Sequence, residues 1–130
     1  MNIELWKGSN DQPKQDRFLA SLNYSHGLLT AQIEYRKLDQ SYLIAFRTPH
    51  YFRVMDEGDL LKFQSQFDTP VFADGFIYQA YDSELINYCF NEKHEIFEKD
   101  KFNHFILVTD DEFIDVITYD DQPTIVAIDV

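Results

Sequence analysis

Six carboxylates lie within fifteen residues near the end of this sequence, in the segment VTDDEFIDVITYDDQ, which contains no lysine or arginine. Carboxylates gathered in this way suit three kinds of chemistry. They can hold a divalent metal ion, act as a pair in acid–base catalysis, or form a surface for a positively charged partner. Each kind makes a different demand on the spacing of the acids.

The spacing fits a calcium site poorly and leaves a magnesium site open. A calcium-binding loop needs oxygen ligands at fixed alternate positions and a glycine at its turn, and DDEFIDVITYDD has neither. Magnesium binds through as few as one or two carboxylates, so a small metal-dependent hydrolase is an alternative function. The simpler interpretation is two polar turns on either side of a strand over residues 113–119, and it predicts no metal ligand. The turn residues are Asp110, Asp111, Glu112, Asp120 and Asp121.

Asp115 differs from the other acids because strand alternation places it on one face with Phe113 and Ile117. Burying a carboxylate there without a partner is costly. One explanation is a structural bond to Arg47, Arg53, a histidine or backbone N–H groups. The other is that Asp115 is presented to a basic residue of another protein.

Motifs of enzymatic chemistry are weak elsewhere in the chain. His94 and Glu98, in HEIFE, lack the second histidine of the zinc-protease motif and are typical of a solvated ion pair. The chain contains no G-x-S-x-G turn for a nucleophilic serine and no glycine-rich phosphate loop. Cys89, the only cysteine, has apolar neighbours that favour a buried, inert thiol, although a cysteine–histidine pair would form only in the fold. We predict no catalytic residue and no cofactor.

The whole net charge of −12 lies in the second half of the chain. Residues 1–65 carry eight acids and eight bases, whereas residues 66–130 carry fifteen acids and three bases. Binding to phosphates or to anionic lipids requires lysine and arginine, so direct contact with nucleic acid or a membrane surface is disfavoured. The asymmetry favours a cationic protein partner, or it serves only the solubility of a ligand-binding or scaffold domain.

Alternation with a period of two predicts most of the elements that position these residues. Residues 18–25 and 28–36, with His26 and Gly27 between them, are expected to form an antiparallel hairpin with one wet face. Further strands are expected over residues 42–48, 51–55, 75–81, 104–108, 113–118 and 124–128.

Two short helices are expected to interrupt these strands. Leu60, Phe63 and Phe67 form the apolar stripe of the first, and Ser83 is a natural N-cap for the second. The predicted class is therefore α+β, mainly antiparallel β-sheet with two short helices inserted between strands. A single domain over residues 1–130 accommodates this arrangement.

Three segments resemble small bacterial proteins grouped with the immunity proteins of toxin–immunity systems. They are RVMDEGDLL, DSELINYCF and HFILVTDDEFIDVI, at residues 53–61, 82–90 and 104–117. The resemblance covers roughly residues 50–126 and brings no catalytic motif with it. It implies a binding protein that neutralises a cognate toxin.

The charge and the resemblance together predict an acidic, non-enzymatic inhibitor that masks the basic active-site surface of a cationic, nuclease-type toxin. No secretion signal or membrane-spanning stretch is visible, so we expect a cytoplasmic protein. Tyr81 and Phe113 are further candidates for an aromatic anchor. The expected partner-binding residues are Asp110, Asp111, Glu112, Asp115, Tyr119, Asp120 and Asp121.

Overall fold

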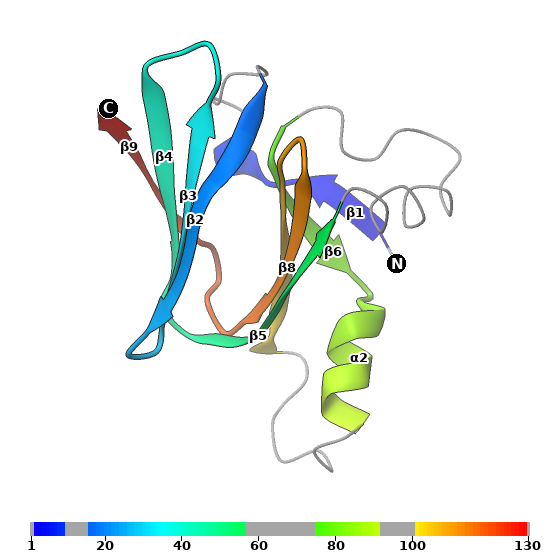
Figure 1. Ribbon diagram of the computed structural model, residues 1–130. Helices are drawn as coiled ribbons and strands as arrows, with labels where there is room; N and C mark the ends of the chain where they lie inside the picture. Colours follow the sequence, from blue (N-terminus) through cyan, green and yellow to red (C-terminus); the bar gives the residue numbers. More distant parts are fainter. Residues whose placement is uncertain (1, 10–15, 57–74, 92–100, 130) are drawn as a thin grey trace.

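The computed structural model describes residues 2–9, 16–56, 75–91 and 101–129 (Figure 1). In this part of the chain strands predominate. They are β1 (Asn2–Leu5), β2 (Arg17–Ser25), β3 (Leu28–Tyr35), β4 (Gln40–Phe46), β5 (Pro49–Asp56), β6 (Ile77–Tyr81), β7 (Asn103–Val108), β8 (Glu112–Thr118) and β9 (Thr124–Asp129). The short 3-10 turn η1 (Lys7–Ser9) and helix α2 (Glu84–Asn91) complete the described elements.

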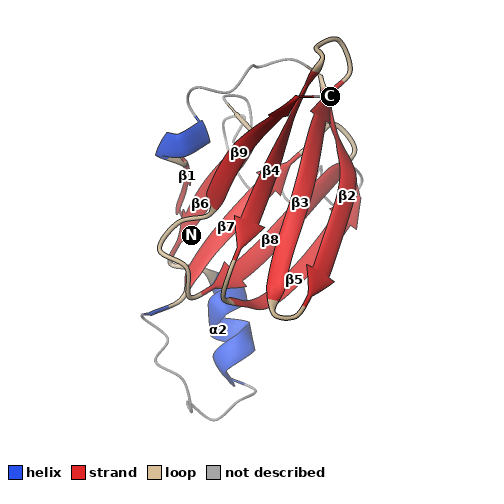
Figure 2. Cartoon of the chain, turned by 90° about the vertical axis from the view of Figure 1, so that its left-hand side faces the viewer, coloured by secondary structure: helices blue, strands red, loops and turns tan. Residues whose placement is uncertain are grey.

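The strands form two antiparallel sheets that lie face to face. The five-stranded sheet has the order β1-β6-β7-β8-β5, and the four-stranded sheet has the order β2-β3-β4-β9. Figure 2 shows the four-stranded sheet in front of the five-stranded one, with α2 below both. Along the described strands, the chain passes from one sheet to the other after β1, after β4 and after β8.

The main core fills the space between the two sheets. Strand β3 alternates between buried and partly exposed residues, and Leu29, Ala31, Ile33 and Tyr35 point inward, as the sequence pattern predicts. They pack in one cluster with side chains of the five-stranded sheet such as Phe105. Burial raises the pKa of Tyr35 to about 12, which marks a closed interior rather than a wet site.

The predicted hairpin of residues 18–36 is confirmed. Strands β2 and β3 pair from Arg17 opposite Tyr35 to Ser25 opposite Leu28. His26 and Gly27 have φ angles of 52° and 79°, the left-handed conformation at both positions that a tight two-residue hairpin turn requires.

The expectation of an α+β fold with two helices is met only in part, and the fold is more nearly all-β. Helix α2 begins after Ser83, whose Oγ accepts a hydrogen bond of 3.1 Å from the backbone N–H of Ile86, as an N-cap does. The other expected helix, with its stripe of Leu60, Phe63 and Phe67, lies outside the described residues. Among the described helices, none has the length and apolar character needed to span a membrane.

One strand of the described part of the chain was not predicted from the sequence. Strand β1 forms the edge of the five-stranded sheet and pairs with β6, from Asn2 opposite Tyr81 to Leu5 opposite Tyr78. Four residues give too little alternation for a sequence pattern to reveal.

Helix α2 packs against one end of the five-stranded sheet, on the face turned away from the other sheet. Leu85 and Cys89 from the helix form a cluster with Phe102 and Ile117. The thiol of Cys89 is buried, as predicted. This contact places the N-terminus of α2 over the ends of β6, β7 and β8.

Candidate functional site

Strand β8 separates the predicted carboxylates into two groups at its opposite ends, with Asp115 between them. Residues 110–112 lie at the turn between β7 and β8, and Asp120 and Asp121 follow the other end of the strand. Seven strand residues, at ~3.3 Å each, hold the two groups about 20 Å apart. These residues therefore do not form one continuous acidic patch, because an extended strand holds its two ends apart.

The acids of the β7–β8 turn are bonded within the chain. Arg36 Nε lies 3.7 Å from the carboxylate of Asp110, and Arg36 Nη2 donates a hydrogen bond of 3.2 Å to Asp111. Glu112 accepts a hydrogen bond of 2.7 Å from the hydroxyl of Thr109. These contacts agree with the polar-turn interpretation, and they leave less negative charge for a partner than the sequence suggests.

Asp115 is buried within the five-stranded sheet, with 1% of its surface exposed. Its Oδ2 accepts a hydrogen bond of 2.8 Å from Nε of Arg53, which stands opposite it on β5. Its Oδ1 lies 2.6 Å from Nε2 of His104 on β7. The structural explanation of Asp115 accounts for its position, since both oxygens are occupied and the carboxylate offers no surface to a partner.

His104 extends this line of bonds to the start of α2. Its Nδ1 lies 2.7 Å from Oγ of Ser83, and both residues are buried. The sequence identified Ser83 only as a helix cap and gave His104 no role. The contact between His104 and Asp115 could have been predicted from the β7–β8 hairpin. Pairing Val108 with Phe113 brings positions 104 and 115 to the same face of adjacent strands.

Asp120 and Tyr119, beyond the other end of β8, contribute mainly to local structure. The Asp120 carboxylate accepts hydrogen bonds from the backbone N–H groups of Arg47 and Thr48, at 2.6 Å and 2.9 Å, and from the Thr48 hydroxyl. The ring of Tyr119 stacks on Phe102 with 3.9 Å between the centroids. Asp120 thus holds the bend between β4 and β5, while Tyr119 stays partly exposed.

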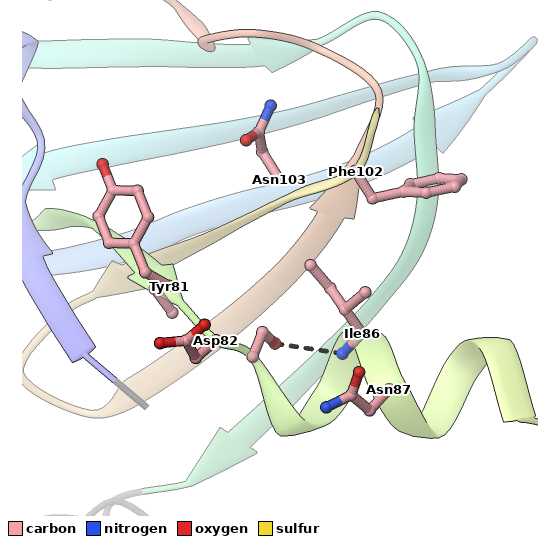
Figure 3. Close-up of a pocket in the computed structure, with 8 residues that line it drawn as sticks. Tyr81, Asp82, Ile86, Asn87, Phe102 and Asn103 are labelled. Atoms are coloured by element: carbon pink, nitrogen blue, oxygen red, sulfur yellow. Dashed lines mark hydrogen bonds between the residues drawn. The ribbon is translucent and has the colours of Figure 1, made fainter. Parts of the chain in front are cut away.

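A pocket of about 450 Å³ opens where β6 turns into α2 (Figure 3). Figure 3 shows Asn87 on the helix, with Tyr81 and Asn103 on the strand side. Asp82, at the turn, has a φ of 53°, a left-handed conformation that is uncommon for a residue other than glycine. The lining residues are Ala80, Tyr81, Asp82, Ser83, Ile86, Asn87, Phe102 and Asn103.

A second pocket, of about 380 Å³, shares Tyr81 with the first. Its other lining residues are Glu4, Leu5, Trp6, Lys7, Gln79, Asp121 and Gln122. Tyr81 is 44% exposed and borders both pockets. Within the described part of the chain, Glu4, Asp82 and Asp121 form no ion pair with a lysine or arginine.

We call this surface the Tyr81 face. It consists of Glu4, Tyr81, Asp82, Asn87, Asn103 and Asp121. The sequence analysis named Tyr81 and Asp121 among its candidates. Glu4 and Asp82 were missed, because only the pairing of β1 with β6 and the positive φ at the strand–helix turn bring them beside Tyr81.

The geometry gives the metal alternative no supporting arrangement. In the ranges 2–9, 16–56, 75–91 and 101–129, no group of three or more His, Cys, Asp or Glu side chains is placed to hold an ion. The carboxylates considered for magnesium lie at the two ends of β8, and those of the β7–β8 turn are bonded to Arg36 and Thr109 rather than turned toward a common ion. The pair of His94 and Glu98 lies outside the described residues.

Comparison of the chain with protein-family models, with curated proteins and with solved structures finds no match. A function for the chain therefore has to be argued from its own residues and their geometry.

Proposed function

We propose that this chain is an acidic protein-binding inhibitor, an immunity protein that acts in the cytoplasm and neutralises a cationic, nuclease-type toxin through the Tyr81 face. One observation carries the proposal. An exposed tyrosine borders two pockets and is flanked by three carboxylates that no described base neutralises. Such a surface offers an aromatic anchor surrounded by negative charge.

The charge of the molecule fits a nuclease as the partner. An enzyme that holds a phosphate backbone presents clustered lysine and arginine, and a surface of carboxylates competes for them. The net charge of −12 adds a long-range attraction. Complementary fields of this kind raise association rates by about 10- to 1,000-fold at low salt.

The second pocket suits a cationic side chain of the partner. The face of the Tyr81 ring attracts a guanidinium or ammonium group, and the carboxylates of Glu4 and Asp121 pair with it. Lys7 lines the same pocket, but two carboxylates against one ammonium leave its lining negative. Arginine and tyrosine are among the residues that most often dominate the binding energy of protein interfaces.

Coexpression with the product of each neighbouring reading frame that encodes a basic domain tests the proposal. The wild-type chain is expected to restore growth, and the pair Asp82→Lys and Asp121→Lys is expected to lose protection because it reverses the charge beside Tyr81. The matched control is Asp110→Lys with Asp111→Lys, which makes the same charge change at the other end of the sheet and should still protect. Failure of the wild-type chain to protect, or equal loss by both pairs, contradicts the proposal.

A further inference from the structure

Ser83, His104 and Asp115 form a continuous line of short hydrogen bonds that the inhibitor proposal does not use. Ser83 Oγ lies 2.7 Å from His104 Nδ1, and His104 Nε2 lies 2.6 Å from Asp115 Oδ1. Arg53 Nε holds the second oxygen of Asp115 at 2.8 Å. These are the residue types and distances of a serine nucleophile, its general base and the carboxylate that orients the base.

The position of each proton in this line follows from its neighbours. The carboxylate of Asp115, paired with Arg53, only accepts, so Nε2 of His104 donates to it. In the neutral ring Nδ1 is then a lone pair, and it accepts the hydroxyl proton of Ser83. Asp115 therefore holds His104 in the tautomer that can remove this proton. Compared with serine proteases, the two ring nitrogens have exchanged their roles.

Ser83 also has access to a pocket, which an ordinary helix cap does not need. It lines the 450 Å³ pocket together with Tyr81, Asn87 and Asn103. Figure 3 marks the hydrogen bond between Ser83 Oγ and the N–H of Ile86. That bond occupies one lone pair of the hydroxyl oxygen and leaves the other for attack on a carbon atom.

Two features of the strand–helix turn suit acyl transfer. The backbone N–H groups of the first helical turn have no partner inside an α-helix, and the positive end of the helix dipole lies there. Two of these groups are already bonded, since the N–H of Ile86 donates to Ser83 Oγ and that of Asn87 to the Ser83 carbonyl. The N–H groups of Glu84 and Leu85, together with the dipole, are the ones left to stabilise an oxyanion beside Ser83. Asp82, immediately before Ser83, is held at φ 53°, and backbone conformations of this kind cluster at active sites.

We propose that Ser83 is the nucleophile of an acyl-transfer site in this pocket, and that the site hydrolyses small neutral or cationic carboxylic esters. The charge class follows from Asp82 on the pocket wall. Its carboxylate has no ion-pair partner among the described residues, so it repels anionic acyl groups. Ser83 Oγ bonds to the acyl carbon while its proton passes to Nδ1 of His104. Asp115 stabilises the imidazolium that results.

The remaining steps need only water. The bond between the acyl carbon and the alkoxy group breaks, and the leaving alcohol takes the proton from Nδ1 of His104. A water molecule then attacks the acyl-serine and gives its proton to Nδ1. Collapse of this second intermediate returns the proton to Ser83 Oγ and releases the carboxylic acid.

A second serine–histidine pair in the chain supplies a matched control. Ser25 Oγ lies 3.1 Å from Nδ1 of His26 in the exposed hairpin turn. Within the described residues, no carboxylate hydrogen-bonds to His26. If a serine–histidine contact alone activated the hydroxyl, both serines would react. If the buried carboxylate and the pocket are needed, only Ser83 would react.

Reaction of the wild-type protein with an alkyl fluorophosphonate, followed by intact-mass measurement and peptide mapping, tests the proposal. One adduct is expected, on Ser83, forming about 10²- to 10⁴-fold faster than any adduct on Ser25. The rate should fall by a similar factor in His104→Gln. Labelling of Ser83 no faster than of Ser25, or an adduct elsewhere, overturns the proposal.

The variant Ser83→Asn tests whether a loss of labelling comes from the missing hydroxyl or only from unfolding. Asparagine retains the capping acceptor but has no hydroxyl, so this variant should melt near the wild-type temperature, form no adduct and not cleave p-nitrophenyl acetate. The comparison of Ser83 with Ser25 is made in the wild-type chain. The proposal can therefore be contradicted even if a variant fails to fold. The labelling requires no toxin, and its outcome is therefore separate from that of the inhibitor proposal.

Discussion

The two ends of the five-stranded sheet carry the same kind of side chain in different states. At the β7–β8 turn, Asp110 and Asp111 lie against Arg36. At the opposite end, Asp82 and Asp121 border the exposed Tyr81, and in the described part of the chain neither has an ion-pair partner. The difference teaches that a count of acids gives the charge of a molecule, whereas the charge available to a partner depends on which bases fold beside each acid.

Of the changes that compare bonded with free carboxylates, Asp115→Ala is expected to have the largest effect, and it lowers the free energy of unfolding. His104 loses its buried acceptor, whereas Arg53, whose side chain is 42% exposed, is rehydrated by water. Leaving a buried donor unsatisfied costs about 1–3 kcal/mol in free energy of unfolding. Urea unfolding followed by Trp6 fluorescence measures the loss. Asp110→Ala, which removes an exposed ion pair, should cost no more than about 1 kcal/mol. Similar losses in both variants would show that Asp115 is not the internal support described here.

Tyr81→Ala is expected to give the largest loss of binding on the Tyr81 face. Truncating a central aromatic anchor costs about 2 kcal/mol or more, which weakens toxin binding by roughly 30-fold. Titration calorimetry against the purified toxin domain measures the change. Tyr24→Ala is the matched control, since Tyr24 is more exposed than Tyr81 but lies on β2, where its ring contacts Phe52. A greater loss in the Tyr24 variant would move the interface to the other sheet.

Local patterns predicted the strands and the capped helix well, because alternation and capping each depend on a few adjacent residues. The alternation of β3 and the N-cap at Ser83 are examples. Patterns also placed Asp115 on the face of its strand, and they named Arg53 as one of several possible partners, beside Arg47, a histidine and backbone N–H groups. They did not show that Arg36 reaches the β7–β8 turn, since this contact joins residues 75 positions apart. Tertiary pairing of this range decides which acids are free, so the extent of the Tyr81 face required the structure.

Reversing the free acids should change the rate of association more than the stability of the chain. Asp82→Lys with Asp121→Lys is expected to slow association with the toxin domain by about 10-fold at low salt, and by much less at high salt where the field is screened. Stopped-flow measurements at two ionic strengths provide the comparison. The pair Asp110→Lys and Asp111→Lys makes the same change beside Arg36, and its effect should be smaller. An equal effect of both pairs would mean that only net charge steers the encounter.

The smallest expected effect is a difference in stability between variants of two adjacent acids, Asp120 and Asp121, at the same end of the sheet. Asp120 accepts two backbone N–H groups from the bend between β4 and β5, whereas Asp121 lies exposed on the wall of the second pocket. Asp120→Ala should lower the free energy of unfolding by about 1 kcal/mol, because solvent replaces hydrogen bonds that are themselves exposed. Asp121→Ala should stay within about 0.5 kcal/mol of the wild type. Thermal unfolding of both variants makes the comparison, and a reversed order would exchange the structural and the binding roles of these two residues.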